Sequence, residues 1–428
     1  MTQNLEVADV DAGKSTQQLF GERLQRMRAA MALQQPDRIP VMLGFGNGLA
    51  DLAGTTRREM VENAEKQNTA LLEAAQRFQP DVVISYPFGP EMSRALGDRM
   101  TKWPGLGLED NQSFQFHEQE FMKVEDYDDF INDMGDWTLR KYLPRAFSEL
   151  EGLALLPPLG LLAAGFYGMV GQAAKFNAPP VISAFQALAK GAQARGQWLG
   201  RMGGSIKLLA ENGFPPSPLA GPMASAPFDF MANTLRGMRG IFLDIRRCPE
   251  KLLAAEERLI KMQVDTAVAD CKAWHLNCVM LFLHRGSDGF ISVRDFEKFY
   301  WPQLKAVLLG LIEGGITPYV FWEGCWDQRL DYLKELPKGK VVGAFQSSNL
   351  AKVKEVLGDT MCIVGGMKVS MLSGTVSAKE VRDYTRWLCQ EVGKGGGFIM
   401  STDIFEFEGT DPEMVKVWLE ATREFGQY

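Results

Sequence analysis

The sequence predicts an α/β protein in which parallel strands alternate with helices, and two observations carry this prediction. Amphipathic helical patterns at 293–314 and 377–392 separate short apolar runs in the last third of the chain. Unbroken apolar runs bounded by turn residues, with helices between them, are typical of parallel strands buried on both faces. The five runs are LNCVMLFL (276–283), ITPYVFW (316–322), KVVGAFQ (340–346), MCIVGG (361–366) and GFIMST (397–402).

Three further runs bring the number of predicted strands to eight. They are RIPVML (38–43), DVVISY (81–86) and PLAGPMA (218–224), and a helical pattern at 54–78 separates the first two. Eight strands alternating with helices predict a (β/α)8 TIM barrel. A doubly wound open sheet is the alternative, but GFGNG (44–48) lacks the spacing and the acidic partner of a dinucleotide-binding turn.

The predicted organisation is one barrel with additions. We expect residues 1–35 to be a flexible tail with a lead-in helix, and 36–428 to be the barrel. Residues 87–215 break the alternation of strands and helices, which predicts a long insertion after strand 2. It holds a hairpin, with strands in 100–103 and 113–123, followed by helices. Insertions of this length are often functional, so we expect a lid over the barrel mouth.

Composition limits the classes of function. The chain has 428 residues, 46% hydrophobic and 23% charged, with a net charge of −7. A nucleic-acid-binding protein needs a basic face, and a membrane span needs about 18 consecutive apolar residues. Neither is visible, and neither is a secretory signal, so the expected location is the cytoplasm. The six scattered cysteines predict buried, reduced thiols, with only Cys325 placed to face a site.

The candidate catalytic residues follow the predicted strands, because a barrel places its chemistry at the carboxyl ends of its strands. His284 and Arg285 follow one strand and offer a base or metal ligand and an anion clamp. The alternative is that Arg285 pairs with Asp288 only to shape the loop. Glu323 lies between two tryptophans, which favours a general acid or a metal ligand. The alternative here is a salt bridge to Arg285 or Lys368.

The remaining predictions complete a metal set and a pocket. Asp403 follows the last strand, and with His284 and Glu323 it could bind a metal ion through oxygen and nitrogen. Aromatic and polar residues near the strand ends are predicted to line the substrate pocket. These are Phe45, Asn47, Tyr86, Trp322, Trp326, Gln346 and Met367.

Several phrases of this sequence resemble the uroporphyrinogen decarboxylase superfamily, in the branch similar to cobalamin-linked methyltransferases. The resemblance runs from about 36 to 426. It is carried by KWPGLGLEDNQSFQFHEQEFMKVEDYDDF, LRGMRGIFLDIRRCPEKLLAAEE, GFISVRDFEKFYWPQLKAVL, WEGCWDQRLDYLKELPKGKVVG and VLGDTMCIVGG. It implies a single (β/α)8 barrel, a homodimer, and a small-molecule substrate. It also implies a cobalamin, bound or carried by a corrinoid partner protein, and zinc in the thiol methyltransferases.

The sequence departs from both well-understood patterns of that superfamily. True decarboxylases have an arginine-rich motif after the first strand, whereas MLGFGNGLADLAG stands here. Thiol methyltransferases bind zinc through a His-x-Cys pair and a later Cys, whereas this chain has Phe321-Trp322-Glu323 and Asp403-Ile404. The leading hypothesis is corrinoid-dependent demethylation or methyl transfer of a small, methoxylated or similar substrate, with weak or absent zinc. The alternatives are a decarboxylase or other lyase on a carboxylated substrate, and a binding or partner subunit whose strand-end groups pair with one another.

Overall fold

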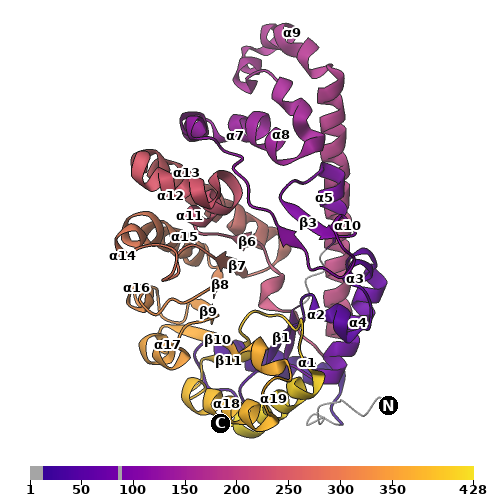
Figure 1. Cartoon of the computed structure of the whole chain (residues 1–428), viewed down its shortest axis with the longest axis vertical. Coiled ribbons are helices and arrows are strands. Elements are labelled where there is room, and N and C mark those ends of the chain that lie inside the picture. Colours follow the sequence, from indigo (N-terminus) through magenta and orange to yellow (C-terminus); the bar gives the residue numbers. More distant parts are fainter. Residues whose placement is uncertain (1–12, 85–88) are drawn as a thin grey trace.

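The computed structural model describes residues 13–84 and 89–428, and at its centre lies a sheet of six parallel strands (Figure 1). The strands are β6 (Met223–Ala224), β7 (Cys278–Leu283), β8 (Thr317–Trp322), β9 (Val341–Phe345), β10 (Met361–Met367) and β11 (Phe398–Thr402). Their order in the sheet follows the chain. The mixed α/β class and the five parallel strands of the last third are therefore confirmed.

Two more predicted strands form a second parallel sheet, β1 (Met42–Gly44) with β2 (Val82–Ile84). Isolated parallel bridges connect it to β11 of the larger sheet and to the segment before β6. Val41 pairs with Met400 of β11, and Val83 pairs with Pro216, shortly before β6. The small sheet therefore lies beside β11 and beside the segment that leads into β6.

The prediction for 218–224 was wrong in its first part. Pro218–Ala220 form a 3-10 turn, and only Met223 and Ala224 pair as a strand. Pro218 and Pro222 lack the N–H groups that a sheet ladder needs, which leaves the strand short.

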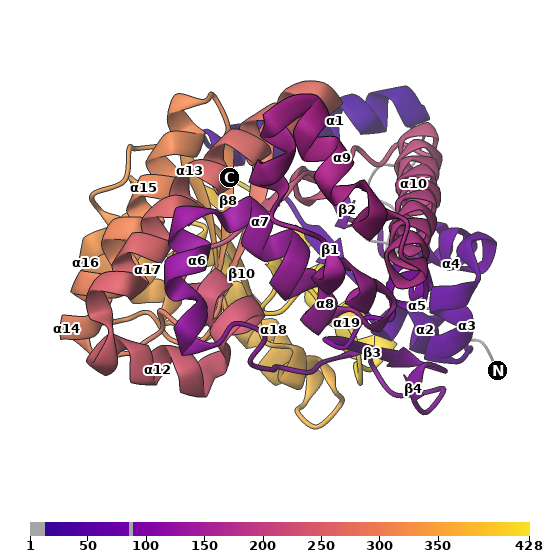
Figure 2. The ribbon, with the colours of Figure 1, turned by 90° about the horizontal axis from the view of Figure 1, so that it is seen from above.

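Helices surround the strands on the outside, as the view in Figure 2 shows. The predicted helix at 54–78 is divided by Asn63 into two helices, and 293–314 and 377–392 are helical with short π-helical turns. The outer helices are α2 (Gly48–Leu52), α3 (Arg57–Glu62), α4 (Ala64–Phe78), α11 (Pro227–Phe230), α12 (Gly237–Arg247), α13 (Pro249–Trp274), α14 (Val293–Asp295), α15 (Trp301–Glu313), α16 (Leu330–Leu333), α17 (Leu350–Leu357), α18 (Ala378–Trp387) and α19 (Pro412–Phe425).

The two faces of the strands bury different residues, because successive side chains of a strand point to opposite sides. One face packs against the helices and includes Val279, Leu281 and Val320. The other face forms a separate buried cluster, to which seven of the eight strands contribute: Met42, Val82, Cys278, Met280, Tyr319, Phe321, Val342, Ala344, Cys362, Val364 and Ile399. We call this second face the inner face. If the alternation of side chains continues past the strand ends, residues 284, 323, 346 and 403 lie on the inner face.

Residues 89–215, here called the arm, connect β2 to the segment before β6. The predicted hairpin is confirmed, since β3 (Thr101–Pro104) pairs antiparallel with β5 (Gln115–Phe116). A separate small core joins the arm's helices through Leu150, Leu153, Leu156, Val181, Ala184 and Ala187. Other arm elements are α5 (Glu91–Leu96), β4 (Gly107–Leu108), α6 (Tyr127–Asn132), α7 (Met134–Trp137), α8 (Leu143–Ala146), α9 (Gly165–Phe176) and α10 (Pro179–Glu211).

The expected lead-in helix is α1 (Thr16–Met31), which begins at a capping box. The Ser15 hydroxyl accepts from the Gln18 backbone N–H, and the Gln18 side chain accepts from the Ser15 backbone N–H. Most of the expected tail before it, residues 1–12, lies outside the described residues.

Candidate functional site

His284 and Glu323 lie side by side because they follow neighbouring parallel strands. β7 ends at Leu283 and β8 ends at Trp322, and these two residues are partners in the register. The His284 Nε2 lies 3.4 Å from the Glu323 Oε2, and the two side chains are 35% and 42% exposed. An imidazole and a carboxylate in contact, both reachable from solvent, can exchange a proton with a bound molecule.

Asn233 determines which nitrogen of His284 carries the proton. The Arg285 Nε donates to the Asn233 Oδ1 over 3.0 Å, so the amide NH2 faces the imidazole. The Asn233 Nδ2 lies 3.0 Å from the His284 Nδ1. An amide nitrogen only donates, so Nδ1 accepts. We therefore infer that the neutral ring carries its proton on Nε2, directed toward Glu323.

Asp229 holds the backbone of this strand end in place. Its Oδ2 accepts from the His284 N–H (3.0 Å) and the Tyr300 hydroxyl (2.7 Å), and its Oδ1 accepts from the Arg285 N–H (2.9 Å). The side chain is fully buried, and burial raises the pKa of the carboxyl although these donors favour its charged form. Three donors on one buried carboxyl leave the loop little freedom to move.

Arg285 is bound by a carboxylate of the arm. The Arg285 Nη2 lies 2.9 Å from the Glu118 Oε2, and the Glu118 Oε1 accepts from the Met238 N–H over 2.7 Å. The expected alternative pairing with Asp288 is not formed, because Asp288 lies beside Arg329 at 3.7 Å. Glu323 likewise contacts His284 rather than Arg285 or Lys368.

Asp403 does not join His284 and Glu323, so the predicted metal set is not assembled. Its Oδ1 accepts from the Val369 N–H over 3.0 Å, and burial raises the pKa of this carboxyl. β11 lies three strands beyond β8 in the sheet, which explains the separation. Within the described residues no group of three or more His, Cys, Asp or Glu side chains could hold a metal ion. Burial also raises the pKa of the half-buried Cys325 thiol, which disfavours a thiolate ligand.

Four of the predicted pocket residues lie in the core instead. Trp322 and Trp326 are fully buried and contact each other edge to face at 4.8 Å. Phe45 packs against Phe407 at 5.0 Å, and Met367 is fully buried. Their clusters lie on the helix-facing side of the strands rather than on the inner face. The burial of these four side chains contradicts the prediction that they line an open pocket. Phe45, Trp322 and Met367 have the alternation of the helix-facing side, and Trp326 packs on Trp322 from the loop after β8.

The other predicted pocket residues make local contacts. Gln346 accepts the Gly324 N–H through its side-chain oxygen over 2.7 Å, at the same strand ends as Glu323. Asn47 donates to the Glu406 carboxylate from its backbone (2.8 Å) and its side chain (3.2 Å), which joins the loop after β1 to the loop after β11. Tyr86 lies outside the described residues.

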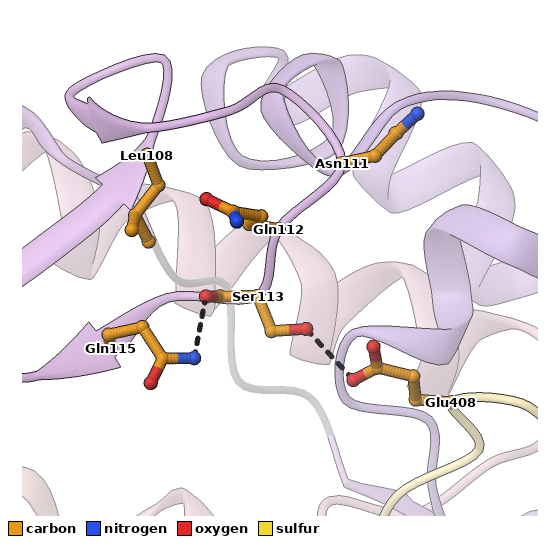
Figure 3. Close-up of a pocket in the computed structure, with 6 residues that line it drawn as sticks. All are labelled: Leu108, Asn111, Gln112, Ser113, Gln115 and Glu408. Atoms are coloured by element: carbon orange, nitrogen blue, oxygen red, sulfur yellow. Dashed lines mark hydrogen bonds between the residues drawn. The ribbon is translucent and has the colours of Figure 1, made fainter.

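Two surface cavities lie away from these groups. The first, of about 460 Å³, is lined by Leu108, Asn111, Gln112, Ser113, Gln115 and Glu408 (Figure 3). Figure 3 shows the Ser113 hydroxyl donating to the Glu408 carboxylate, over 2.8 Å. The second, of about 580 Å³, lies between α13 and α15. Neither cavity is lined by His284 or Glu323.

The family of the chain follows from its sequence. The profile of the uroporphyrinogen decarboxylase family matches residues 167–425, which include the ends of β7, β8 and β11. The chain belongs to this family. Within it, the chain is 24% identical over 180 residues to the uroporphyrinogen decarboxylase of Pseudoalteromonas translucida, covering 41% of this chain and 49% of that protein. It is 26% identical over 194 residues to that of Syntrophotalea carbinolica, covering 45% and 55%. The chain spans about half the length of the curated relatives that it matches.

A solved structure has a similar fold over nearly the whole length of this chain. A methyltransferase from Methanosarcina mazei superposes with a TM-score of 0.58 and 13% sequence identity, covering 94% of this chain and 98% of that one. At this identity the likeness concerns the fold. The structural likeness includes the arm, whereas the match to the family profile begins only at residue 167, within the arm.

Proposed function

We propose that this protein is a methyltransferase that acts in corrinoid-dependent demethylation or methyl transfer of a small, methoxylated or similar substrate. The observation that carries the proposal is the contact between His284 and Glu323 at neighbouring strand ends. The fold shared with a methyltransferase supports the same class of reaction. A cobalamin, bound or carried by a partner protein, would supply the nucleophile that accepts the methyl group.

His284 and Glu323 would handle the proton in this reaction. When the bond between a methyl carbon and its oxygen breaks, the electron pair stays on the oxygen, which then needs a proton. The pair can hold one proton between Nε2 and Oε2, close to solvent, and deliver it to that oxygen. In the reverse direction the same pair would remove the proton from an accepting hydroxyl. Asn233 and Asp229 keep the imidazole oriented for both directions.

Zinc does not fit the residues that the structure brings together. Thiolates hold zinc well in methyl transfer to thiols, and the strand ends here offer one imidazole and one carboxylate in contact. We therefore expect an oxygen rather than a thiol such as coenzyme M as the heteroatom of the substrate. Elemental analysis of the purified protein tests this point. Stoichiometric zinc that is lost in Glu323→Ala would contradict it.

We also propose that the two sheets close into a single (β/α)8 barrel with the arm as its lid. The bridges Val41–Met400 and Val83–Pro216 support closure, as does the single buried cluster on the inner face. The Glu118–Arg285 ion pair supports the role of the arm, because it joins the arm to the strand ends. The homodimer implied by the family resemblance is part of this proposal, and analytical ultracentrifugation tests it.

The decisive experiment is a spectroscopic titration with methylcobalamin and a panel of phenols and alcohols, followed in reverse with their methyl ethers. We expect methyl transfer to at least one oxygen acceptor and none to a thiol. Glu323→Gln serves as the matched loss-of-function variant and the exposed Glu355→Gln as the control. Normal folding without transfer to any acceptor would count against the proposal.

A decarboxylase or other lyase is the second candidate, and one contact favours it. Arg285 already holds a carboxylate, that of Glu118, at 2.9 Å. A substrate carboxylate could take the same position while a neighbouring acid protonates the carbanion. Arg285→Ala would then abolish binding of an acidic substrate, whereas it should leave binding of a neutral methyl ether nearly unchanged. Isothermal titration with both ligand types separates the two candidates.

A binding or partner subunit without catalysis remains the third candidate. Its prediction was mutual pairing of the strand-end polar groups, and Glu118, Arg285, Asn233, His284 and Glu323 do form one connected series. Under this hypothesis the purified chain binds its partner equally well after His284→Asn. Loss of methyl transfer in that variant would exclude it.

A further inference from the structure

The far end of the arm exposes a cluster of large apolar side chains. Of the nineteen large apolar side chains that are exposed in the described residues, eight lie between 155 and 185. Phe166 and Tyr167 are 76% and 84% exposed, and their rings meet at 5.8 Å. Single exposed apolar residues are ordinary, but a contiguous cluster marks an interaction surface. We call six of these residues the arm tip: Leu155, Leu161, Phe166, Tyr167, Met169 and Val170.

The arm tip lies where it can reach a large object before the rest of the molecule does. Figure 1 shows α9 at one extreme of the molecule, beyond the end of α10 and far from the strands. The 33 residues of α10 correspond to a helix about 50 Å long. A lipid surface could therefore bind the tip without covering the strand ends.

Within the segment that carries the arm tip the charged side chains are all basic, although the exposed Glu149 and Glu151 precede Leu155 and the Asp136 carboxylate accepts from the Leu159 N–H over 3.3 Å. Between residues 152 and 210 the chain contains five Lys and Arg residues and no Asp or Glu, although the whole protein carries −7. Lys175 lies on α9 itself. Lys190 lies eleven residues into α10, about 16 Å from the start of that helix. Exposed apolar rings with Lys175 and Lys190 behind them are complementary to anionic phospholipids, whose acyl chains and phosphates attract the two groups.

We propose that the arm tip is a peripheral membrane-binding element that inserts into the interface of an anionic lipid surface. No single helix in the described residues is long and apolar enough to cross a membrane. One bent pair, Ser148–Leu155 with Leu159–Phe176, passes the length and composition test together, with a bend of 46°. Pro157 and Pro158 lie at the bend. A bent apolar pair suits insertion from one side, with its rings at the level of the head groups.

A second copy of the chain fits this surface less well. A twofold contact places the same surface of both copies together, so Lys175 and Lys190 would approach their own counterparts. Segment 152–210 itself offers no carboxylate to pair with them, and Glu151, at its border, already pairs with Arg99. Anionic lipid supplies that missing charge. The proposal is also independent of the reaction proposed above, because it uses none of the strand-end residues.

Flotation of the purified full chain with lipid vesicles tests the proposal. We expect binding to mixed phosphatidylcholine–phosphatidylglycerol vesicles and little binding to phosphatidylcholine alone. Phe166→Ser with Tyr167→Ser should lower the partition coefficient roughly tenfold or more. Lys175→Glu with Lys190→Glu should lower it several-fold. Raising the salt from about 0.1 M to about 1 M should also lower the partition coefficient several-fold, because the Debye length falls from about 10 Å to about 3 Å.

Matched controls and a second readout keep the test decisive. Trp274→Ser removes an exposed aromatic ring at the end of α13, and Lys394→Glu reverses an exposed charge in a distant turn. Both should bind vesicles like the unaltered protein. Circular dichroism melting shows whether each variant is folded. Failure of the unaltered protein to float with anionic vesicles would overturn the proposal. So would a self-association, measured by analytical ultracentrifugation, that disappears in the Phe166 and Tyr167 variant while lipid binding is absent throughout.

Discussion

The strand region from β7 to β11 and the arm are built on different plans. In the strand region, hydrogen-bonded neighbours follow one another along the chain, and apolar residues are buried on both faces. The arm has a small core of its own and leaves large apolar side chains exposed at its tip. The two regions meet at the strand ends through the Glu118–Arg285 ion pair. The strand region thus places His284 and Glu323 side by side, while the arm adds a second core and also packs on the main core through Met122, Tyr127, Phe130 and Trp137.

The largest expected effect tests whether the strand region alone carries the chemistry. His284→Asn and Glu323→Gln should each lower the rate of methyl transfer by about 10²–10⁴-fold, because each removes one half of the proton-transfer pair. The double variant should lose little more than either single one, since the two groups act as a unit. Steady-state kinetics measure this. Additive losses would mean that the two residues act separately.

The second prediction tests whether the two cores unfold separately. Leu283→Ala in the main core and Leu153→Ala in the arm core should each cost about 2–5 kcal/mol, because both side chains are fully buried. Leu283→Ala should lower the stability of the whole protein. Leu153→Ala should speed hydrogen exchange mainly within 89–215. Mass spectrometry of deuterium uptake distinguishes them. Equal acceleration in β7–β11 for both variants would contradict separate cores.

The third prediction concerns an ionisable group that is buried on α13, outside the arm. Glu256 is fully buried on α13, neither of its carboxyl oxygens has a hydrogen-bond partner among the described residues, and burial raises its pKa well above the usual range. A raised pKa in the folded state means that stability is complete below the unfolded pKa, near 4.5, and is lost as the pH rises through the folded value.

Urea unfolding between about pH 5 and pH 8 measures this effect. The free energy of unfolding of the unaltered protein should fall with rising pH relative to Glu256→Gln, by up to about 1.4 kcal/mol per pH unit. The neutral amide removes the ionisation, so the variant should lack this component of the slope. Identical slopes for the two proteins would show that Glu256 does not titrate in this range.

The smallest expected effect concerns the contact between the two regions. Glu118→Gln should change the free energy of unfolding by no more than about 1 kcal/mol, because the ion pair is only partly buried. Limited proteolysis of the arm should nevertheless become faster, and the KM for a substrate should change more than kcat. Glu109→Gln, an exposed carboxylate of the same hairpin, is the control. Unchanged proteolysis would mean that other contacts hold the arm.

The sequence predicts some of the strand-end residues correctly and others wrongly. His284 and Glu323 could be placed because each follows an apolar run, and both positions share the alternation of the inner face. The same alternation, had it been applied, would have excluded Trp322 and Met367 from an open pocket. Asp403 satisfies the alternation too, but its distance from β8 depends on how the sheet is ordered in space.

The sequence by itself determined the family, and local periodicity determined the succession of strands and helices and the strand-end positions of His284 and Glu323. The tertiary structure alone decided their partners. Asn233, Asp229 and Glu118 reach the strand ends from 51, 55 and 167 residues away in the chain. No local pattern marks such a residue, since a polar side chain on a helix or in a hairpin looks the same whether solvent or a histidine lies beside it. Long-range packing sets the hydrogen bonds, and these select the tautomer and the orientation of His284.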